Sequence, residues 1–578
     1  MSHHLFATAA NAAPFGSENL LSIDVLAESA DAAEKSGVDQ FLDKVFAPFA
    51  QVLSDIVFFA LPLPGGAELP LIVVWLMAAA IFLTVYLRFQ PITGLTHSLE
   101  VIRGKLTRKT DPGEVSSFQA LATELSGTVG LGNIAGVAVA ISVGGPGAAL
   151  WIILFGFLSM SVKMAEATLG VKYRVVREDG TTAGGPMYYL KAGLAEIGRP
   201  KLGKFLSMFY AIAALIGVFG AGNLFQANQG AAILVNATGG ESSWFADKLW
   251  LVGVIMAVLA GLVIIGGIKK IADYTSAITP LMAILYMIGT IAVILVNITS
   301  VPTAFVEMFS GAFTGHGVAG GFVGVAIIGI QRALFSNAAG VGSAGMAHSA
   351  VKTSRPATEG YTAMWEPLVD SVIVCTLTAL AIITTGLYKQ ENDGSDAAGV
   401  ELTSSAFSTV ASWFPVLLTI CVILFAFSTV LSYSYYGQKA TDFLTGGSEV
   451  AQRVFQVVWI LAIVVGASIG LESVVMFSDA MFFLMSVPNL LGIYFLAKVL
   501  RQEILHHKVR ADTGTLPEIP EELQVGLRDH EPTQEQVSSE AKRIAADEAR
   551  EDRVRQAFHE KTEERARGRR MWKRGRKE

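Results

Sequence analysis

From residue 69 to residue 500 the chain is a succession of long apolar runs separated by short polar loops. An α-helix rises about 1.5 Å per residue, so about 20 residues are needed to cross a hydrocarbon core about 30 Å thick. Eleven runs reach that length, with approximate bounds 69–89, 115–143, 147–172, 205–236, 247–266, 273–298, 318–350, 358–386, 408–436, 452–470 and 473–500. Lipid offers no partners to backbone N–H and C=O groups, so such runs cross it as helices. The sequence therefore predicts an all-α polytopic membrane protein with about eleven transmembrane helices.

The composition agrees with a chain that lies mostly in lipid. Hydrophobic residues make up 52% of the 578 residues and charged residues 16%, whereas an average soluble domain is about 25% charged. The two cysteines, Cys375 and Cys421, fall inside apolar runs, so neither a disulfide framework nor a cysteine-based metal site is expected. The sequence between the runs carries no nucleotide-binding loop or soluble domain, which argues against an ATP-driven pump. We expect no organic cofactor and no nucleic-acid partner.

The two ends of the chain differ from its middle. Residues 1–68 are predicted to form an extracytoplasmic segment, in which the interrupted apolar stretch 42–60 forms an interfacial helix rather than a twelfth span. The N-terminus lacks the basic flank and apolar core of a cleaved signal peptide, so 69–89 should act as the membrane signal. Residues 503–578 are dense in charge and predict a cytoplasmic tail. The tail either binds anionic lipid or serves only to keep the protein soluble.

Lysine and arginine are distributed unevenly among the loops, and cytoplasmic loops carry their excess. The basic loops lie at 103–109, 172–201 and 269–270, whereas the intervening loops at 236–247 and 390–404 are acidic or neutral. This alternation predicts a multi-pass protein of the inner (plasma) membrane with its N-terminus outside and its C-terminus in the cytoplasm. An odd number of crossings, such as eleven, also places the two ends of the chain on opposite sides of the membrane.

Without 69–89, ten runs remain, and they divide into two sets of five, 115–298 and 318–500. An odd number of crossings gives the two sets opposite orientations. This is the inverted-repeat arrangement of many secondary transporters, in which glycine- or proline-interrupted helices at corresponding positions mark the binding site. The sequence therefore predicts one extra N-terminal helix followed by a 5+5 inverted-repeat core.

Both sets open with a glycine-rich stretch, one from Ser126 to Gly136 and one from Phe335 to Gly345. Each glycine in a helix interior costs about 1 kcal/mol relative to alanine, so these helices are predicted to break. Freed backbone groups are tolerated in a bilayer only around a protein-lined cavity or a ligand. Close packing of small residues is the alternative for either stretch, but the matching positions and the asparagine and hydroxyl side chains of both stretches favour a site. On this ground Asn337 is a candidate for substrate binding.

Several polar side chains lie inside apolar runs, where they are costly unless they have a role. Gln226 is expected to face the substrate path, with interhelical hydrogen bonding as the alternative. Asp370 is the strongest ionisable candidate and is taken as a ligand of the coupling cation. Lys163 and Glu166 lie three residues apart, and we expect them to pair with each other.

Five strings identify the core with a known family: TVGLGNIAGVAVAI (128–141), GGPGA (144–148), KMAEATLGVKYR (163–174), GGPMYYL (184–190) and FSNAAGVGSAGMAHSAVKT (335–353). They resemble the alanine or glycine:cation symporter family, over about residues 70–500. The resemblance implies the leucine-transporter-like fold of the amino acid–polyamine–cation superfamily. It also implies sodium-coupled uptake of a small amino acid, so sodium, the amino acid and the lipid bilayer are the expected partners. The oligomeric state stays open.

The resemblance also implies roles for single residues. In the family the backbone N–H groups of the first break meet the substrate carboxylate and an aromatic ring covers it, and the matching positions are Thr128, Leu131, Gly132, Phe335 and Ser336. One sodium site corresponds to the carbonyl of Thr128 with Asn133 and Ser336. A second corresponds to the carbonyls of Ser126 and Val129 with the hydroxyls of Ser428 and Thr429. The chain departs from the family at Ala338, where an acidic residue is usual, and at Glu124, where a small residue is usual.

Other functions remain as alternatives to sodium-coupled symport of alanine or glycine. A proton-coupled transporter of another small amino acid is the nearest alternative. A channel is less favoured because channels rarely need two inverted broken helices. An intramembrane hydrolase with Ser343 and His348 is disfavoured because GVGSAG lacks a nucleophile elbow and no acidic partner for His348 is expected nearby.

Overall fold

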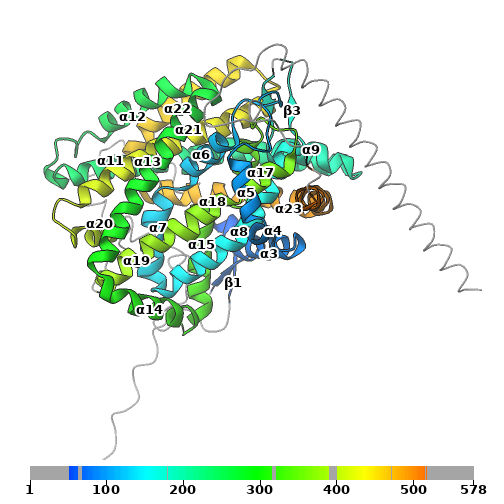
Figure 1. Cartoon of the computed structure of the whole chain (residues 1–578). Helices are drawn as coiled ribbons and strands as arrows, with labels where there is room; N and C mark the ends of the chain where they lie inside the picture. The colour runs from blue at the N-terminus through cyan, green and yellow to red at the C-terminus, as the bar shows by residue number, and fades with distance from the viewer. Residues whose placement is uncertain are drawn as a thin grey trace, which may run out of the picture.

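The computed structural model describes residues 51–62, 68–178, 180–314, 321–389, 400–469, 471–513 and 516. The described residues are almost entirely helical (Figure 1). Two small antiparallel hairpins join them: β1 (Ala60–Pro62) pairs with β2 (Glu68–Pro70), and β3 (Val175–Val176) with β4 (Thr182–Ala183). The larger part of the predicted extracytoplasmic segment and most of the predicted tail lie outside the described residues.

The helices follow one another with short connections. The first half holds α3 (Leu71–Tyr86), α4 (Gln90–Thr93), α5 (Leu95–Ile102), α6 (Ser117–Thr128), α7 (Leu131–Gly144), α8 (Gly147–Lys172), α9 (Pro186–Glu196), α10 (Pro200–Phe219), η2 (Gly220–Leu224), α11 (Phe225–Ala237), η3 (Gly240–Ser242), α12 (Leu249–Ile264) and α13 (Gly267–Val296). The second half holds η4 (Ile298–Ser300), α14 (Val301–Thr314), α15 (Gly321–Asn337), α16 (Ser343–His348), α17 (Pro356–Ala363), α18 (Trp365–Pro367), η5 (Leu368–Val374), α19 (Cys375–Thr385), η6 (Leu387–Lys389), α20 (Val400–Ser408), α21 (Pro415–Thr445), α22 (Glu449–Ser468) and α23 (Leu471–Asp512).

Each predicted apolar run coincides with one helix or with consecutive helices. Seven helices in the described residues are long and apolar enough to cross a membrane, and the bent pair α6–α7 makes an eighth. The helices α3, α12 and α15 are apolar but shorter, with 16, 16 and 17 residues. The chain is therefore a multi-pass membrane protein, and a total of eleven crossings stays a prediction.

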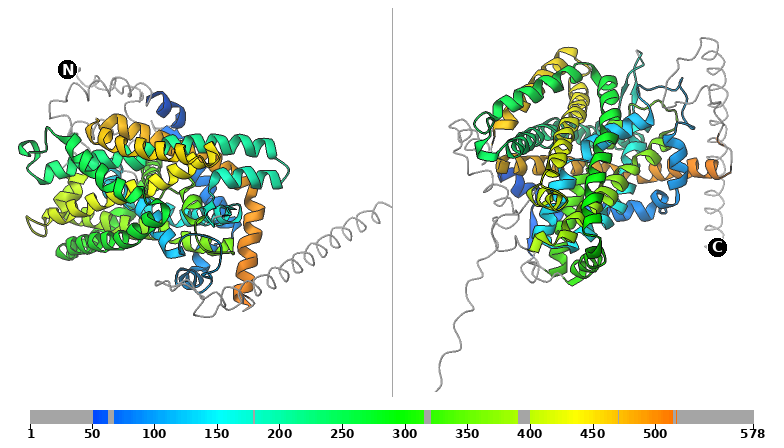
Figure 2. Two further views of the ribbon diagram at one scale, coloured as in Figure 1. Left: turned by 90° about the horizontal axis from the view of Figure 1, so that it is seen from above. Right: turned by 60° about the vertical axis from the view of Figure 1, so that its left-hand side comes forward.

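Two helices extend beyond their predicted runs. Helix α21 begins at Pro415, about two turns after the start of the predicted run 408–436, and continues to Thr445, about two and a half turns beyond its end. Proline fits the first turn of a helix, and the polar end of α21 stays helical because Gln438 and Asp442 are buried against protein rather than lipid. Helix α23 runs on to Asp512, past the residue where the tail was predicted to begin, and its C-terminal part extends beyond the neighbouring helices (Figure 2). Of the predicted interfacial helix, residues 51–57 are helical and 42–50 lie outside the described residues.

The structure interrupts both glycine-rich helices. Helix α6 ends at Thr128 and α7 begins at Leu131 with a bend of 41°. Helix α15 ends at Asn337, and the chain turns through left-handed conformations at Ala338 (φ 52°), Gly340 and Gly342 (both φ 94°) before α16. Glycine adopts positive φ without strain, which explains its presence at two of these three positions.

The entry to α6 and the exit from α16 are joined outside the helices. Val115 and Val351 form a parallel β-bridge, in which the N–H of Lys352 donates to the carbonyl of Val115 at 2.8 Å. The Arg174 guanidinium, just after α8, reinforces this junction. It donates hydrogen bonds to four backbone carbonyls of the two strands, those of Pro112, Ser349, Val351 and Thr353.

Helix α8 crosses α16 so closely that only glycine fits. A Cβ added at Gly170 would lie 2.4 Å from the carbonyl oxygen of Gly345 and 2.8 Å from its Cα. Gly136 on α7 differs, because a Cβ there would meet no atom nearer than Arg332 Cδ at 3.9 Å.

We predict that Gly170→Ala lowers the thermal unfolding midpoint of the purified protein, because backbone atoms must move apart and overpacking costs about 1–3 kcal/mol. Gly136→Ala is the matched control, and its midpoint should stay unchanged or rise, since alanine favours a helix by about 1 kcal/mol. Equal midpoints for the two variants would contradict the close crossing of α8 and α16.

Candidate functional site

A small cavity lies where the first break faces the second broken helix. It is lined by Gly127, Thr128, Gly130, Leu131 and Gly132 from the first break, Ala221 and Gln226 from η2 and α11, Phe335 from α15, Thr429 and Tyr433 from α21, and Phe482 from α23. Its volume is about 20 Å³, which is room for about one water molecule. A larger solute therefore requires its walls to move apart.

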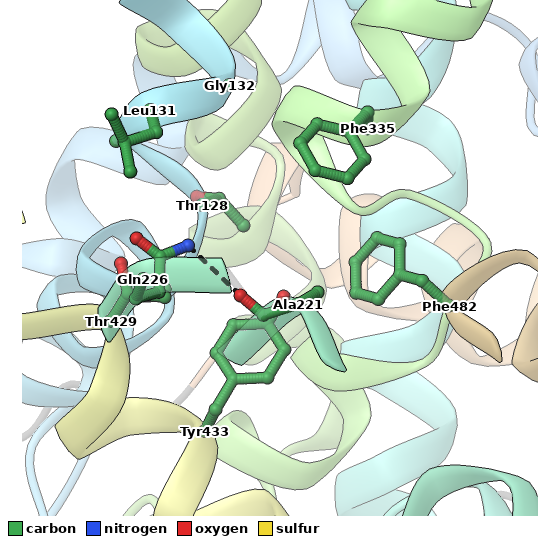
Figure 3. Close-up of a pocket in the computed structure, with 11 residues that line it drawn as sticks. Thr128, Leu131, Gly132, Ala221, Gln226, Phe335, Thr429, Tyr433 and Phe482 are labelled. Carbon is green, nitrogen blue, oxygen red and sulfur yellow. Dashed lines mark hydrogen bonds between the residues drawn. The ribbon is translucent and has the colours of Figure 1, made fainter. Parts of the chain in front are cut away.

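Aromatic rings form one wall of the cavity. The Phe335 ring meets those of Phe225 and Phe482 edge-on, with centroids 5.9 Å and 6.2 Å apart, and Phe482 lies 6.3 Å from Tyr433. Figure 3 shows Phe335, Phe482 and Tyr433 around the space. A Cβ added at Gly132 would lie 3.1 Å from the Cα of Ser336, so the lack of a side chain there lets α7 and α15 approach each other.

Polar groups face the cavity from two elements. The Gln226 side chain is 7% exposed and donates from Nε2 to the carbonyl of Ala221 at 3.0 Å, while its Oε1 is buried without a hydrogen-bond partner among the described residues (Figure 3). Leu131 and Gly132 open α7, and the first N–H groups of a helix have no partner within it. The cavity therefore offers an acceptor and donors together, which suits a zwitterion.

A first cluster of oxygen-bearing side chains lies behind the break. Asn133 donates from Nδ2 to the Asp370 carboxylate at 2.5 Å, and Ser336 and Ser371 donate to the same carboxylate at 2.7 Å and 2.9 Å. Asn133 Oδ1 accepts from the N–H of Gly130 at 2.8 Å, so the amide caps the first turn of α7. The structure thus brings together three of the predicted ligands, Asn133, Ser336 and Asp370. The fourth, Thr128, lines the cavity, and its hydroxyl donates to the Glu124 carbonyl at 3.2 Å.

A second cluster joins α21 to the end of α6. The Ser126 carbonyl accepts from the hydroxyls of Thr429 at 2.8 Å and of Ser428 at 3.3 Å. Ser428 also donates to the carbonyl of Phe425 at 3.0 Å, the back-bonding expected of serine in a helix. Val129 is buried and follows α6, where its N–H donates to Leu125. The predicted second ligand group is therefore assembled around the Ser126 carbonyl.

Asn337 does not line the cavity. Its Oδ1 accepts from the N–H of Ala339 and its Nδ2 donates to Ser371, both at 3.0 Å, so it holds the turn after α15. Two further amides lie near Gln226 in the sequence and bond to other elements: Asn223 donates to the Trp459 carbonyl and Asn228 to the Ile469 carbonyl. Interhelical bonding, the alternative given above for Gln226, is thus seen at these two neighbouring amides.

The predicted Lys163–Glu166 pair is wrong. Lys163 Nζ lies 2.6 Å from Glu124 Oε1 and 3.1 Å from Glu366 Oε2. Glu166 instead accepts from the N–H groups of Gly340 and Gly342 and from Asn489, and so holds the second break. Sequence spacing describes neighbours on one helix, whereas these partners come from other helices.

The expectation that His348 lacks an acidic partner is also wrong. Glu359 and Glu366 lie 2.7 Å and 2.8 Å from its two ring nitrogens. Ser343 bonds elsewhere, to Glu124 and to Lys163. A serine and a histidine with different partners do not form the nucleophile–base pair of a hydrolase.

Three cavity residues were missed by sequence reasoning, namely Ala221, Tyr433 and Phe482. The GAGN turn of η2 was the available signal for Ala221, because glycine in an apolar helix often marks a close approach. Within the described part of the chain, three or more His, Cys, Asp or Glu side chains nowhere gather as a metal site. A cation here would therefore be held mainly by hydroxyl, amide and carbonyl oxygens.

Comparison with known proteins agrees with this geometry. The sequence profile of the Sodium:alanine symporter family matches residues 65–520. The sodium/alanine symporter AgcS of Methanococcus maripaludis is 37% identical over 435 residues, covering 75% of this chain and 93% of AgcS. The putative sodium/proton-dependent alanine carrier protein YrbD of Bacillus subtilis is 35% identical over 364 residues, covering 61% of this chain and 72% of YrbD. The probable sodium/glutamine symporter GlnT of Bacillus subtilis is 31% identical over 432 residues, covering 74% of this chain and 86% of GlnT.

These relatives are carriers rather than enzymes, which agrees with a site that lacks a nucleophile–base pair and offers donors and acceptors to a small solute. The chain is a transporter and belongs to the sodium:alanine symporter family.

Proposed function

We propose that this chain is a secondary active transporter that couples the uptake of alanine or glycine to sodium by alternating access. The observation that carries the proposal is the cavity at the first break, which Gln226 and the opening turn of α7 both line, and at which Gln226 Oε1 is buried without a hydrogen-bond partner among the described residues. Both broken helices and two oxygen clusters meet around this space.

The cavity chemistry fits a small α-amino acid. The free N–H groups of Leu131 and Gly132 would bind the carboxylate at the positive end of the α7 dipole. Gln226 Oε1 would accept from the ammonium group. The rings of Phe335, Tyr433 and Phe482 line the cavity, and if they remain beside the substrate after the walls move apart, they favour a small side chain such as that of alanine over a longer one such as that of glutamine.

The two oxygen clusters would hold the coupling cation. Asn133, Ser336 and Asp370 would form one sodium site with the Thr128 carbonyl, beside the substrate. Ser428 and Thr429 would form a second site with the carbonyls of Ser126 and Val129. Backbone carbonyls freed by a broken helix coordinate sodium in many transporters, and their hydroxyl, amide and carbonyl oxygens are the ligands available here. Proton coupling is the second candidate. It is favoured by the buried acidic side chains and by the relative YrbD, whose name includes both sodium and proton.

The proposed architecture has eleven crossings: the extra helix α3 and the repeats 115–298 and 318–500. In support, each repeat opens with a broken helix, α6–α7 or α15–α16, and the apolar helices coincide with the predicted runs. The basic loops would face the cytoplasm, with the N-terminus outside and the C-terminal tail inside, in the inner (plasma) membrane.

We expect purified protein in vesicles to accumulate labelled alanine or glycine when sodium is higher outside. Replacing sodium by potassium should abolish accumulation, whereas an imposed proton gradient alone should not restore it. Uptake that persists in potassium and follows the proton gradient would replace sodium with the second candidate. Inhibition of labelled uptake by unlabelled alanine and by unlabelled glutamine, measured in parallel, would rank the two amino acids as substrates.

We expect Asn133→Ala to weaken alanine and sodium binding together. Loss of a sodium ligand beside the substrate should lower the coupling free energy between the two, which is reciprocal and typically about 1–3 kcal/mol. The measurement is alanine affinity at several sodium concentrations, normalised to folded protein. Asn337→Ala is the matched control, since Asn337 also caps a break but lies away from the cavity. It should lower the folded yield and leave the sodium dependence of the remaining protein intact. An unchanged sodium dependence in Asn133→Ala would remove Asn133 from the site.

We expect a cysteine at Ser242 to react with a membrane-impermeant reagent from outside, and a cysteine at Glu178 to react only after the membrane is opened, because their loops differ in charge. Both positions are exposed, whereas the native Cys375 and Cys421 are buried and should stay unlabelled. The reverse pattern would invert the proposed topology.

A further inference from the structure

A chain of charged side chains crosses the protein interior beside α16, apart from the cavity. It runs through Glu359, His348, Glu366, Lys163 and Glu124, and each of them is 0% exposed. The links are 2.7 Å from Glu359 to His348, 2.8 Å from His348 to Glu366, 3.1 Å from Glu366 to Lys163 and 2.6 Å from Lys163 to Glu124. Nothing in the proposed transport of substrate and sodium uses His348.

Counting donors at His348 shows that a proton is needed. Its Nδ1 faces Glu359 Oε2 and its Nε2 faces Glu366 Oε1, both at hydrogen-bond distance. A neutral imidazole has one N–H and one lone pair, and an ionised carboxylate only accepts. One of the two contacts would therefore set a nitrogen lone pair against a carboxylate oxygen, unless the three groups together hold one additional proton.

We propose that Glu359, His348 and Glu366 form a buried proton-binding site, the His348 triad, whose occupancy stabilises this conformation of the protein. The proton may be written on the imidazole or on either carboxyl group, since all three positions satisfy the same two contacts. The proposal is independent of which solute and which cation the cavity binds.

The surrounding charges favour the bound proton. Lys163 and Glu166 face the triad from α8, Glu124 from α6 and Tyr436 from α21, and Arg174 lies near Glu359. Glu166 is held by backbone N–H groups and Asn489. Two carboxylates, those of Glu124 and Glu366, contact the single ammonium group of Lys163, whereas Glu359 contacts His348. Among these four side chains alone, Glu359, Glu366, Glu124 and Lys163, the negative charges exceed the positive charge, and a bound proton reduces that excess, which is costly inside a membrane protein.

The chain reaches both broken helices. Glu124 lies on α6 before the first break, where Ser343 and Tyr436 also donate to its carboxylate. His348 ends α16 after the second break. Loss of the proton from the triad would therefore add repulsion next to both breaks at once.

The test uses the full-length protein in detergent without solute. The thermal unfolding midpoint is measured from about pH 6 to about pH 10, because a folded state that binds an additional proton loses stability as pH rises. Ser117 donates to Glu359 Oε1 at 2.6 Å. In Glu359→Gln the amide oxygen can accept from Ser117 and the amide nitrogen can donate to His348 Nδ1, so the same contacts need no additional proton. The slope of the unfolding free energy against pH should fall by the equivalent of one bound proton. The unfolding constant should then change about tenfold less for each pH unit than in the wild type.

A second variant and a control keep the outcomes distinct. Glu366→Gln supplies the same donor from the other side, so it should flatten the slope in the same way and serves if Glu359→Gln does not fold. Glu307→Gln on α14 removes a carboxylate that pairs with Lys389 far along the chain, and it should keep the wild-type slope. A flat wild-type profile, or an unchanged slope in both glutamine variants at the triad, would overturn the proposal. A slope lost only in Glu166→Gln would assign the proton to Glu166 and overturn it as well.

Discussion

A backbone N–H or C=O without a partner is costly in the interior of a membrane, and this constraint shapes the whole core. The chain breaks two of its helices there, so each freed group needs a partner from elsewhere. Asn133 caps the first turn of α7, and Glu166 accepts from two N–H groups of the second break. Ser428 and Thr429 meet the carbonyl left by α6. Part of the polar interior of this protein therefore supplies the partners that two broken helices require.

Much of the fold could be predicted because lipid makes apolar length a direct measure of helix position. The predicted run 147–172 has the same bounds as α8. Apolar length failed to predict the end of α21, where protein rather than lipid covers the helix. A criterion based on hydropathy assigns polar residues to a loop, even when they are buried within a helix. The glycine pattern located both interruptions, because glycine content reflects local backbone preference.

The site could be predicted only in part. Glycine patterns located the two breaks, the family resemblance grouped Asn133 with Ser336, and the cost of an ionisable group inside an apolar run singled out Asp370 as a cation ligand. Spacing along a helix could not assign partners from other helices, which is why Lys163 was matched with Glu166 rather than with Glu124 and Glu366. It also could not show which amides face the cavity: Gln226 does, whereas Asn223 and Asn228 bridge helices.

The β-bridge between Val115 and Val351, with Arg174 bonded across it, has a mechanical consequence. It fastens the base of the first broken helix to the base of the second, so the two bases move as one body. Movement of α7 and α15 relative to the joined bases would then come from rotation at the breaks themselves. The two glycine-rich interruptions would in that case act as paired hinges, and their flexibility would set how far and how fast the cavity opens.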